Sequence, residues 1–275
     1  MYTKHLISFL LLLSLCFSAK AQEKEVLIPF DEQGAKKEIN IWIYQGDIQV
    51  LGKDRKDVLL KYEAKESKLH GDFESFGDEK AKGLKKISHN NADLDISSSG
   101  NVVLIKSKEW KKDLKFYVEV PREIDLFIHY GFGGLVEVEG LLGNVNVESN
   151  SGDIFAKNIK GLVNASTNDG DITVSFAGIP DAKSMILSNV SGDIDVSLPA
   201  EYKSLLKLKT ILGSIYSGFD LNFYEKEESS SDAGKVEELF QLSPANKWSY
   251  AKLNGGGPVL TIQTKGGNIY LRKAD

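Results

Sequence analysis

Between residues 134 and 174, apolar or small residues alternate with polar ones around regularly spaced glycines. Gly134, Gly143, Gly152, Gly161 and Gly170 follow one another at intervals of nine residues. Two and four positions after each glycine stand the pairs Val136/Val138, Val145/Val147, Ile154/Ala156, Val163/Ala165 and Ile172/Val174. Such alternation is typical of strands with one buried face, and a short fixed period is typical of stacked repeats. We therefore predict an all-β fold, a β-solenoid (β-helix-like).

Every second glycine of this series marks one coil, which consists of two short strands flanking a glycine turn. The anchors are Gly134, Gly152, Gly170, Gly192, Gly213 and Gly267, with steps of 18, 18, 22, 21 and 54 residues, so the last step contains an insertion. Coils stacked about 4.8 Å apart align equivalent side chains in columns. The predicted core column, five residues before the anchors, is Val147, Ala165, Leu187, Leu208 and Ile262. The step lengths fit more than one turn arrangement, so the handedness of the coil stays open.

A second column stands three residues before the anchors and is polar. It comprises Ser149, Thr167, Asn189, Thr210 and Thr264. Short hydroxyl and amide side chains form local hydrogen bonds with backbone groups in turns. We interpret this column as a structural ladder.

The part of the chain before residue 126 follows the same pattern less regularly. Gly46 lies between Ile39, Ile41 and Ile43 on one side and Ile48 and Val50 on the other, so one coil is expected to start the stack here. The residues Leu126, Ile128 and Tyr130 fit Gly133 rather than Gly134 as their anchor, which predicts a bulge of one extra residue. Strands are also expected over 102–105 and over 116–120, before Pro121.

These patterns predict one β-solenoid domain over residues 22–275. Its irregular N-terminal coils occupy 22–125, with an insertion near 66–91, and its regular coils occupy 126–275, with an insertion near 222–254. The role of the two insertions stays open.

Residues 1–21 have the pattern of a secretory signal peptide. Lys4 and His5 precede an apolar run from Leu6 to Phe17, and the small-residue pattern Ala19-Lys20-Ala21 predicts cleavage after Ala21. Cleavage there removes Cys16, the only cysteine. A lipid-modified Cys16 is the alternative, which Leu15 disfavours. We expect an exported protein, whether periplasmic, at the cell surface or secreted, with no transmembrane segment in the mature chain.

Composition narrows the range of partners. The formal net charge of the chain is −5 at pH 7, and a nucleic-acid partner would require a basic stripe. We therefore expect no nucleic-acid partner. No motif for a cofactor or a metal is present in the sequence, and none is predicted.

Several segments together resemble a known family. They are VNVESNSGDI at 145–154, TNDGDI at 167–172, KLNGGGP at 252–258 and GNIYLR at 267–272. From about Ile39 to Arg272, the chain resembles exported bacterial β-solenoid domains that carry the label "putative adhesin" and are classed as domains of unknown function. The resemblance implies a β-solenoid of the bacterial cell envelope, and it supplies no catalytic residues.

Aspartates follow several of the glycines and are the residues most suggestive of chemistry. Asp47, Asp153, Asp171 and Asp193 occupy this position, but the column changes to Ser214 and Asn268 in later coils. We favour turn-forming aspartates over a calcium ladder, because calcium-binding nonapeptide repeats need a further glycine pair. The pairs Asp93/Asp95 and Asp193/Asp195 are expected on a solvated face.

One cluster stands out as a candidate for binding. His129, Tyr130 and Phe132 adjoin the predicted bulge, and an exposed aromatic patch at an irregular coil can bind a ligand, although an ordinary surface patch is the alternative. The other histidines of the processed chain, His70 and His89, have no spacing typical of metal ligands.

Three hypotheses for function remain. The first is a non-enzymatic binding, adhesin-like or scaffolding module that engages an envelope glycan or protein. The second is a polysaccharide-active enzyme that uses Asp153, Asp171 and Asp193 with Arg122 in support. The third is a self-assembling structural subunit, because stacked coils have open ends.

Overall fold

The computed structural model describes residues 24–30, 36–66, 93–108, 112–178, 180, 183–225 and 247–274. In this part of the chain all regular structure is β, which confirms the predicted all-β class. The strands are β1 (Lys24–Ile28), β2 (Lys37–Lys53), β3 (Val58–Glu66), β4 (Leu94–Ser99), β5 (Val102–Ser107), β6 (Lys112–Pro121), β7 (Ile124–Phe132), β8 (Leu135–Glu139), β9 (Val145–Ser149), β10 (Asp153–Ile159), β11 (Val163–Asp169), β12 (Ile172–Phe176), β13 (Met185–Ser191), β14 (Ile194–Leu198), β15 (Ser204–Lys209), β16 (Ile215–Ser217), β17 (Asn222–Tyr224), β18 (Ser249–Leu253), β19 (Val259–Gln263) and β20 (Ile269–Lys273). The predicted signal peptide, Cys16, His70, His89 and most of both insertions lie outside the described residues.

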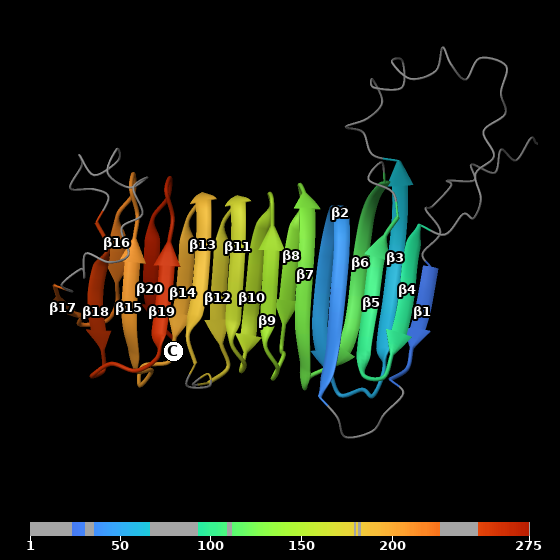
Figure 1. The fold of residues 1–275 in the computed structure, drawn as a ribbon, viewed down its shortest axis with the longest axis horizontal. Helices are drawn as coiled ribbons and strands as arrows, with labels where there is room; N and C mark the ends of the chain where they lie inside the picture. Colours follow the sequence, from blue (N-terminus) through green and yellow to red (C-terminus); the bar gives the residue numbers. More distant parts are fainter. Residues whose placement is uncertain are drawn as a thin grey trace, which may run out of the picture.

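The strands form two layers that run the length of an elongated stack (Figure 1). Sheet A has the order β1-β3-β6-β2-β8-β10-β12-β14-β20-β16. Sheet B has the order β4-β5-β2-β7-β9-β11-β13-β19-β15-β18-β17. The strand β2 is long enough to belong to both sheets. Between the ends of the stack, the strands of successive coils pair in parallel, as predicted for a solenoid of two-strand coils.

The core lies between the two layers and consists of the inward side chains of every coil. The predicted core column is buried throughout: Val147, Ala165, Leu187, Leu208 and Ile262. Aliphatic side chains of adjacent coils face one another at the strand spacing, as in the pair Ile154 and Ile172. Burial of this continuous apolar column is what drives the coils to stack, because a single coil has no partner for its inward face.

The spatial order of the coils differs from their order along the chain. The expected column continues from Leu208 to Ile262, but the structure pairs Ile262 with Leu187 on one side and with Leu208 on the other. The last coil, β19 and β20, therefore lies between the coil of β13 and β14 and the coil of β15 and β16 (Figure 1). In that position both edges of β19 are hydrogen-bonded within the stack.

The predicted bulge is confirmed by the register of β2. Ile41 pairs with Ile128 in β7, whereas Ile48 pairs with Val136 in β8. The offset grows by one residue between the two pairs, so the turn at Gly133 and Gly134 holds one residue more than the turn at Gly46. The predicted strands near 102–105 and 116–120 are also present, as β5 and β6.

Antiparallel strands cover most of the ends of the stack, and the repeat pattern does not predict them. At the N-terminal end, β3 and β1 extend sheet A, and β4 extends sheet B. At the C-terminal end, β18 and β17 extend sheet B. In sheet A the last described strand is β16, which has three residues. These antiparallel strands interrupt the parallel coil repeat. A second copy of the chain therefore cannot continue that repeat at these ends.

The expectation that Asp93 lies on a solvated face is wrong. The Asp93 side chain is buried, with the residue 6% exposed, and it contacts both Lys24 and Lys112. Burial alone would raise the pKa of the Asp93 carboxyl, but the hydrogen bonds from Lys112 and Lys24 outweigh that effect and lower the pKa. Asp93 therefore fastens the start of β4 to β1 and β6, whereas Asp95 is exposed as predicted.

Candidate functional site

The strand β7 leaves the side chains of only two of the three sequence candidates accessible to solvent. Successive side chains of a strand point to opposite faces, and Tyr130 follows His129 directly. His129 points outward from sheet B, while Tyr130 points into the core and is 3% exposed. Phe132, at the end of β7, is 59% exposed.

The hydroxyl group of Tyr130 is held by backbone carbonyl groups. This group contacts the carbonyl oxygen of Gly46 in the preceding coil and lies 2.6 Å from that of Gly133. Burial raises the pKa of the Tyr130 phenol, so the group stays protonated and donates. Thr167 makes a comparable bond to Gly152 of the preceding coil, at 3.4 Å. Tyr130 thus takes the place of the ladder residue at the bulge.

The polar ladder expected from the sequence connects neighbouring coils through four of its five members, whereas Ser149 Oγ donates to the carbonyl oxygen of Ser151 in its own turn. Asn189 Nδ2 donates to the carbonyl oxygen of Gly170 at 3.0 Å, and Thr264 Oγ1 donates to that of Gly192 at 3.1 Å. Thr210 Oγ1 continues the series to Gly267 at 2.6 Å. These side chains satisfy turn carbonyls that the sheets leave unpaired, which is a structural role.

His129 is held between an aromatic ring and a carboxylate. Its imidazole stacks on the indole of Trp42, with ring centroids 3.9 Å apart and planes inclined by 27°. Its Nδ1 lies 3.2 Å from Oε2 of Glu148. The three residues are direct neighbours in the register of β2, β7 and β9. The outward positions of three adjacent strands thus form one fixed aromatic and polar cluster.

A groove of about 450 Å³ opens beside this cluster. Its lining residues are Trp42, Ile43, Tyr44, Lys106, Ser107, His129, Tyr130, Gly131, Phe132, Glu148, Ser149 and Asn150. Trp42, Tyr44 and Phe132 are all large and exposed, with Trp42 44% exposed. We call the groove formed by all of these lining residues the aromatic groove. Exposed aromatic rings beside a few polar groups are typical of a binding surface.

Sequence reasoning missed Trp42 and Tyr44, although a signal for them exists. They alternate with Ile41 and Ile43, which are buried, so the pattern of β2 places both aromatic side chains outward. Large aromatic side chains exposed side by side on a sheet can mark an interaction site. Their proximity to His129 could not be predicted, because it depends on which coil pairs with β2.

The three aspartates proposed for catalysis form a turn column. Asp153 Oδ1 accepts the backbone N–H of Asp171 at 2.9 Å, and Asp171 Oδ1 accepts that of Asp193 at 2.7 Å. Asp193 Oδ1 in turn accepts the N–H of Asn268 at 2.7 Å. Each carboxylate therefore bonds the next coil in space. This arrangement agrees with the turn-forming role favoured from the sequence.

The change from aspartate to other residues in this column also has a spatial explanation. Asn268 Oδ1 continues the series by accepting the N–H of Ser214 at 3.0 Å. Ser214 belongs to the coil of β16, the last one described in sheet A, so no further coil requires an acceptor from it. The column thus runs without interruption from Asp153 to its end.

Arg122 is not brought to these carboxylates. It lies in the turn between β6 and β7, whereas the aspartates follow turns at the other edge of the stack. The nine residues of β7 separate the two edges by about 30 Å. The combination of Arg122 with Asp153, Asp171 and Asp193 is therefore wrong as a single site.

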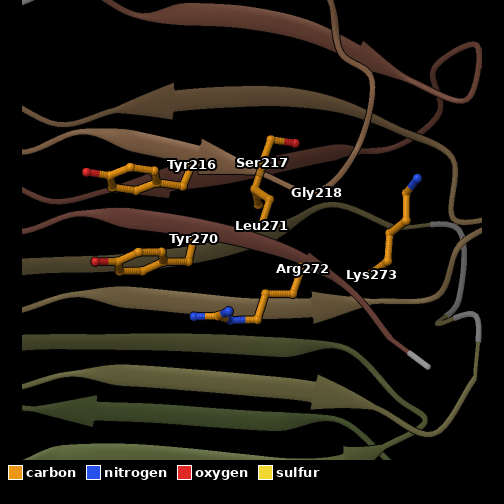
Figure 2. A pocket seen from close by; sticks show the side chains of 7 residues that line it. All are labelled: Tyr216, Ser217, Gly218, Tyr270, Leu271, Arg272 and Lys273. Atoms are coloured by element: carbon orange, nitrogen blue, oxygen red, sulfur yellow. The ribbon is translucent and has the colours of Figure 1, made fainter.

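A second cleft, of about 430 Å³, lies on sheet A near the C-terminal end. Figure 2 shows its residues, among them the rings of Tyr216 and Tyr270 side by side. Those rings are stacked, with centroids 5.1 Å apart and planes inclined by 9°. Arg272 forms a two-pronged pair with Asp195, through Nε at 2.8 Å and Nη2 at 2.7 Å. The stacked rings cover each other and the arginine is neutralised, so this cleft offers fewer free groups than the aromatic groove.

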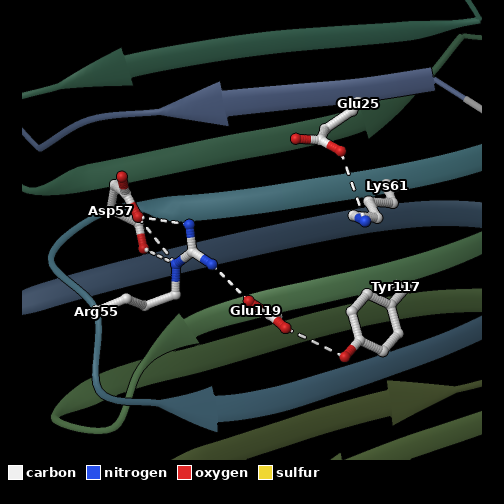
Figure 3. A network of polar contacts seen from close by, with 6 residues as sticks. All are labelled: Glu25, Arg55, Asp57, Lys61, Tyr117 and Glu119. Carbon is white, nitrogen blue, oxygen red and sulfur yellow. Dashed lines mark hydrogen bonds and ion pairs between the residues drawn. The ribbon is translucent and has the colours of Figure 1, made fainter.

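A network of charged and polar side chains lies at the N-terminal end of the stack (Figure 3). Arg55 pairs with Asp57 at 2.7 Å and with Glu119 at 2.5 Å. Glu119 also accepts a hydrogen bond from the Tyr117 hydroxyl at 3.2 Å. Burial, followed by this bond, raises the pKa of Tyr117. The network fastens the turn before β3 to β6, and its guanidinium cation, Arg55, is paired with both carboxylates.

Nowhere in the described ranges do three or more His, Cys, Asp or Glu side chains group as metal ligands would. The described chain also has no helix with the length and apolar character to cross a bilayer.

Comparison with known proteins places the fold. Residues 131–238 match the model of the family described as Toastrack DUF4097. A search of curated proteins found no match.

Two solved structures are similar in shape. A "putative cell adhesion protein" from Clostridium sporogenes is 14% identical, with a TM-score of 0.49 over 92% of this chain and 100% of that one. A "putative adhesin" from Bacteroides fragilis is 12% identical, with a TM-score of 0.41 over 93% of this chain and 98% of that one. The family match over residues 131–238, which include the regular coils β8 to β16, confirms the resemblance drawn from the sequence: this segment matches the Toastrack DUF4097 family, a β-solenoid-like fold.

Proposed function

We propose that this chain is a non-catalytic, adhesin-like binding module of the bacterial cell envelope, and that it binds a carbohydrate through the aromatic groove. The observation that carries the proposal is the groove itself. It combines exposed rings of Trp42, Tyr44 and Phe132 with a stacked imidazole on a rigid sheet. Rigid elements hold a binding surface in place at little entropic cost.

The chemistry of the groove favours a sugar over a purely apolar ligand. Aromatic faces pack against the C–H groups of a sugar ring, and nearby polar groups bond its hydroxyls. The groove offers Lys106, Glu148 and Asn150 for the second purpose. A sugar residue would thus find an apolar floor with donors and acceptors at its rim.

The enzyme alternative has less support. Glu148 is the one carboxylate that lines the groove, and glycoside hydrolysis ordinarily uses a pair. Backbone N–H groups of the next coil already donate hydrogen bonds to the carboxylates of Asp153, Asp171 and Asp193. Their place in turn hydrogen bonding supports a structural assignment.

The self-assembly alternative is disfavoured by the ends of the stack. Antiparallel strands terminate both described ends of sheet B and the N-terminal end of sheet A. The edge strands β16 and β17 have three residues each. Very short edge strands are one common protection against edge-to-edge pairing.

Export is part of the proposal and rests on the sequence of residues 1–21. Cleavage after Ala21 would release a mature chain that begins at Gln22. The mass of the protein purified from the envelope fraction tests this cleavage. Retention of the full 275 residues would contradict it.

The binding proposal is tested with an array of neutral and acidic oligosaccharides, followed by calorimetric titration of the best binder. We expect Trp42→Ala to weaken that binder at least tenfold, because it removes the ring on which His129 stacks and opens the groove. Tyr216→Ala, which removes an exposed ring from the other sheet, is the matched control and should bind like wild type. Equal binding by wild type and Trp42→Ala would refute the assignment of the groove.

A further inference from the structure

A second surface with binding chemistry lies at the C-terminal end of sheet B, where two lysines share one aromatic ring. Lys207 Nζ lies 4.0 Å from the centroid of the Trp248 ring, and Lys209 Nζ lies 5.3 Å from it. Lys207 and Lys209 alternate with the buried residues Leu206 and Leu208 in β15, so both point outward. We call Lys207, Lys209 and Trp248 the basic patch.

Within the described part of the chain, the charges of the basic patch have no acidic partner. Among the described residues, no carboxylate lies within the ion-pairing distance of 4.0 Å from Lys207 or Lys209. Elsewhere on the same molecule, Lys157 is paired with Glu137 and Arg272 with Asp195. Two ammonium groups near the same ring lie within about one Debye length of each other at 0.1 M salt, so each raises the potential at the other. An anion between them would remove that repulsion.

The surroundings add further groups of the same kind. Tyr250 of β18 is the cross-strand neighbour of Lys207, and Lys252 of the same strand lies 5.6 Å from the centroid of the Tyr224 ring. On the other side, Gln263 neighbours Lys209 and donates through Nε2 to Ser188 Oγ at 2.9 Å. The basic patch is thus bordered by aromatic rings on one side and by uncharged hydrogen-bonding groups on the other.

This combination matches an acidic sugar polymer. Ammonium groups bind its carboxylates, aromatic rings pack on its sugar rings, and amide or hydroxyl groups bond its hydroxyls. Nucleic acid is a poorer match, because the whole chain carries a net charge of −5 and would repel a denser polyanion beyond the patch. We infer that the basic patch is a binding site for a carboxylate-bearing polysaccharide.

The register relates this site to the aromatic groove. A single row of outward positions crosses sheet B through Lys209, Gln263, Ser188, Ser166, Glu148, His129 and Trp42. The row spans six strand spacings, or roughly 29 Å. The two sites therefore face the same side and are far enough apart to act separately. One extended polymer can also reach both.

The test uses polygalacturonate as the acidic probe and dextran as the neutral one, at low salt. We expect wild type to bind polygalacturonate and Lys207→Ala/Lys209→Ala to bind it at least about tenfold more weakly, by the usual contribution of lysines at an anionic surface. Lys53→Ala/Lys160→Ala is the matched control: it removes the same charge from exposed positions away from sheet B and should bind like wild type. Thermal unfolding of all variants verifies that each is folded.

Three results would overturn the inference. They are no binding of polygalacturonate by wild type, equal loss in the two double variants, and tighter binding of a single-stranded oligonucleotide or of anionic phospholipid vesicles than of polygalacturonate. Trp248→Phe keeps an aromatic ring and should retain most of the affinity, whereas Trp248→Ala should not. Trp42→Ala separates the two proposals: the groove fails if this variant binds its array ligand normally, and that result leaves the double-lysine comparison unchanged.

Discussion

The same row of outward positions on sheet B carries Ser166 and Ser188 in the middle coils but Trp42 and His129 where β2 meets β7. The inward positions of both regions are alike, with aliphatic residues such as Val147 and Ile128 buried in each. The two regions thus share one core and differ on their surface. Stacking requires only the inward columns, so the outward positions are free to vary. The region with the extra turn residue uses that freedom for large aromatic side chains.

The contrast between the two regions shows where binding chemistry can be placed in a stacked fold. In the middle coils, turn aspartates and ladder residues are occupied by neighbouring coils, as the bond from Asp193 N–H to Asp171 shows. At the aromatic groove, Trp42 and Phe132 remain exposed beside a fixed imidazole. We therefore expect substitutions in the middle coils to change stability and substitutions in the groove to change binding.

One strict requirement of the middle coils is at Gly170. Its φ is +138°, and a Cβ there would lie 2.4 Å from the carbonyl oxygen of Gly152. We expect Gly170→Ala to lower the free energy of unfolding by about 3 kcal/mol or more, since backbone strain and a contact between coils add. Gly178→Ala is the control, because no atom lies within 4 Å of its added Cβ. Similar unfolding midpoints in urea for the two variants would contradict this account.

Asp93 gives the next effect, which depends on pH. Its lowered pKa means that the carboxylate stabilises the fold fully above its usual pKa near 3.8 and that this contribution is lost as the pH falls through the folded-state value. We expect Asp93→Asn to cost about 2 kcal/mol at neutral pH, less than for a fully buried pair because the Lys24 side chain is 45% exposed. Urea unfolding across an acid series should show the gap between wild type and variant closing. A gap of constant size would show that the charge of Asp93 is irrelevant.

The aspartate column gives a smaller effect. Asp193→Ala removes the acceptor for the backbone N–H of Asn268 and for its side-chain Nδ2. One hydrogen-bonding group at a partly exposed turn is worth about 1 kcal/mol, and chemical unfolding measures this loss. Asp169→Ala, at an exposed position on β11, is the matched control. If the Asp193 variant were as stable as the control, the turn column would have no role in holding the coils together.

The aromatic groove should give the smallest change in stability. Trp42 is 44% exposed and packs on His129 at the surface, so Trp42→Ala should change the free energy of unfolding by about 1 kcal/mol or less. Differential scanning calorimetry checks this figure. A loss comparable to that of Gly170→Ala would mean that the groove is part of the core rather than a separate surface.

Much of the fold could be predicted from the sequence because alternation and glycine spacing act within each coil. The core column of Val147 and Leu187, and the extra residue before Gly134, follow directly from those local patterns. The spatial position of Ile262 could not be predicted, since alternation identifies a buried face but not the strand that pairs with it. The antiparallel end strands were missed for the same reason, as they lie outside the repeat.

The candidate site was predicted in part. His129, Tyr130 and Phe132 all line the groove, but most of the Tyr130 side chain lies in the core, because Tyr130 alternates with His129 along β7, and that alternation was available in the sequence. Trp42 lies far from His129 in the chain, and only the pairing of β2 with β7 brings the two together. Long-range pairing of this kind depends on the whole stack.

If ligand binds at the groove where the coil repeat is interrupted, the indole N–H signal of Trp42 should respond to it. The chain has three tryptophans, so a ¹⁵N-labelled sample gives three such signals, and Trp42→Phe and Trp248→Phe assign two of them. On addition of the best array oligosaccharide, the account predicts a saturable shift of the Trp42 signal with an affinity equal to that from calorimetry. A Trp42 signal that stays in place while calorimetry shows saturation would contradict it.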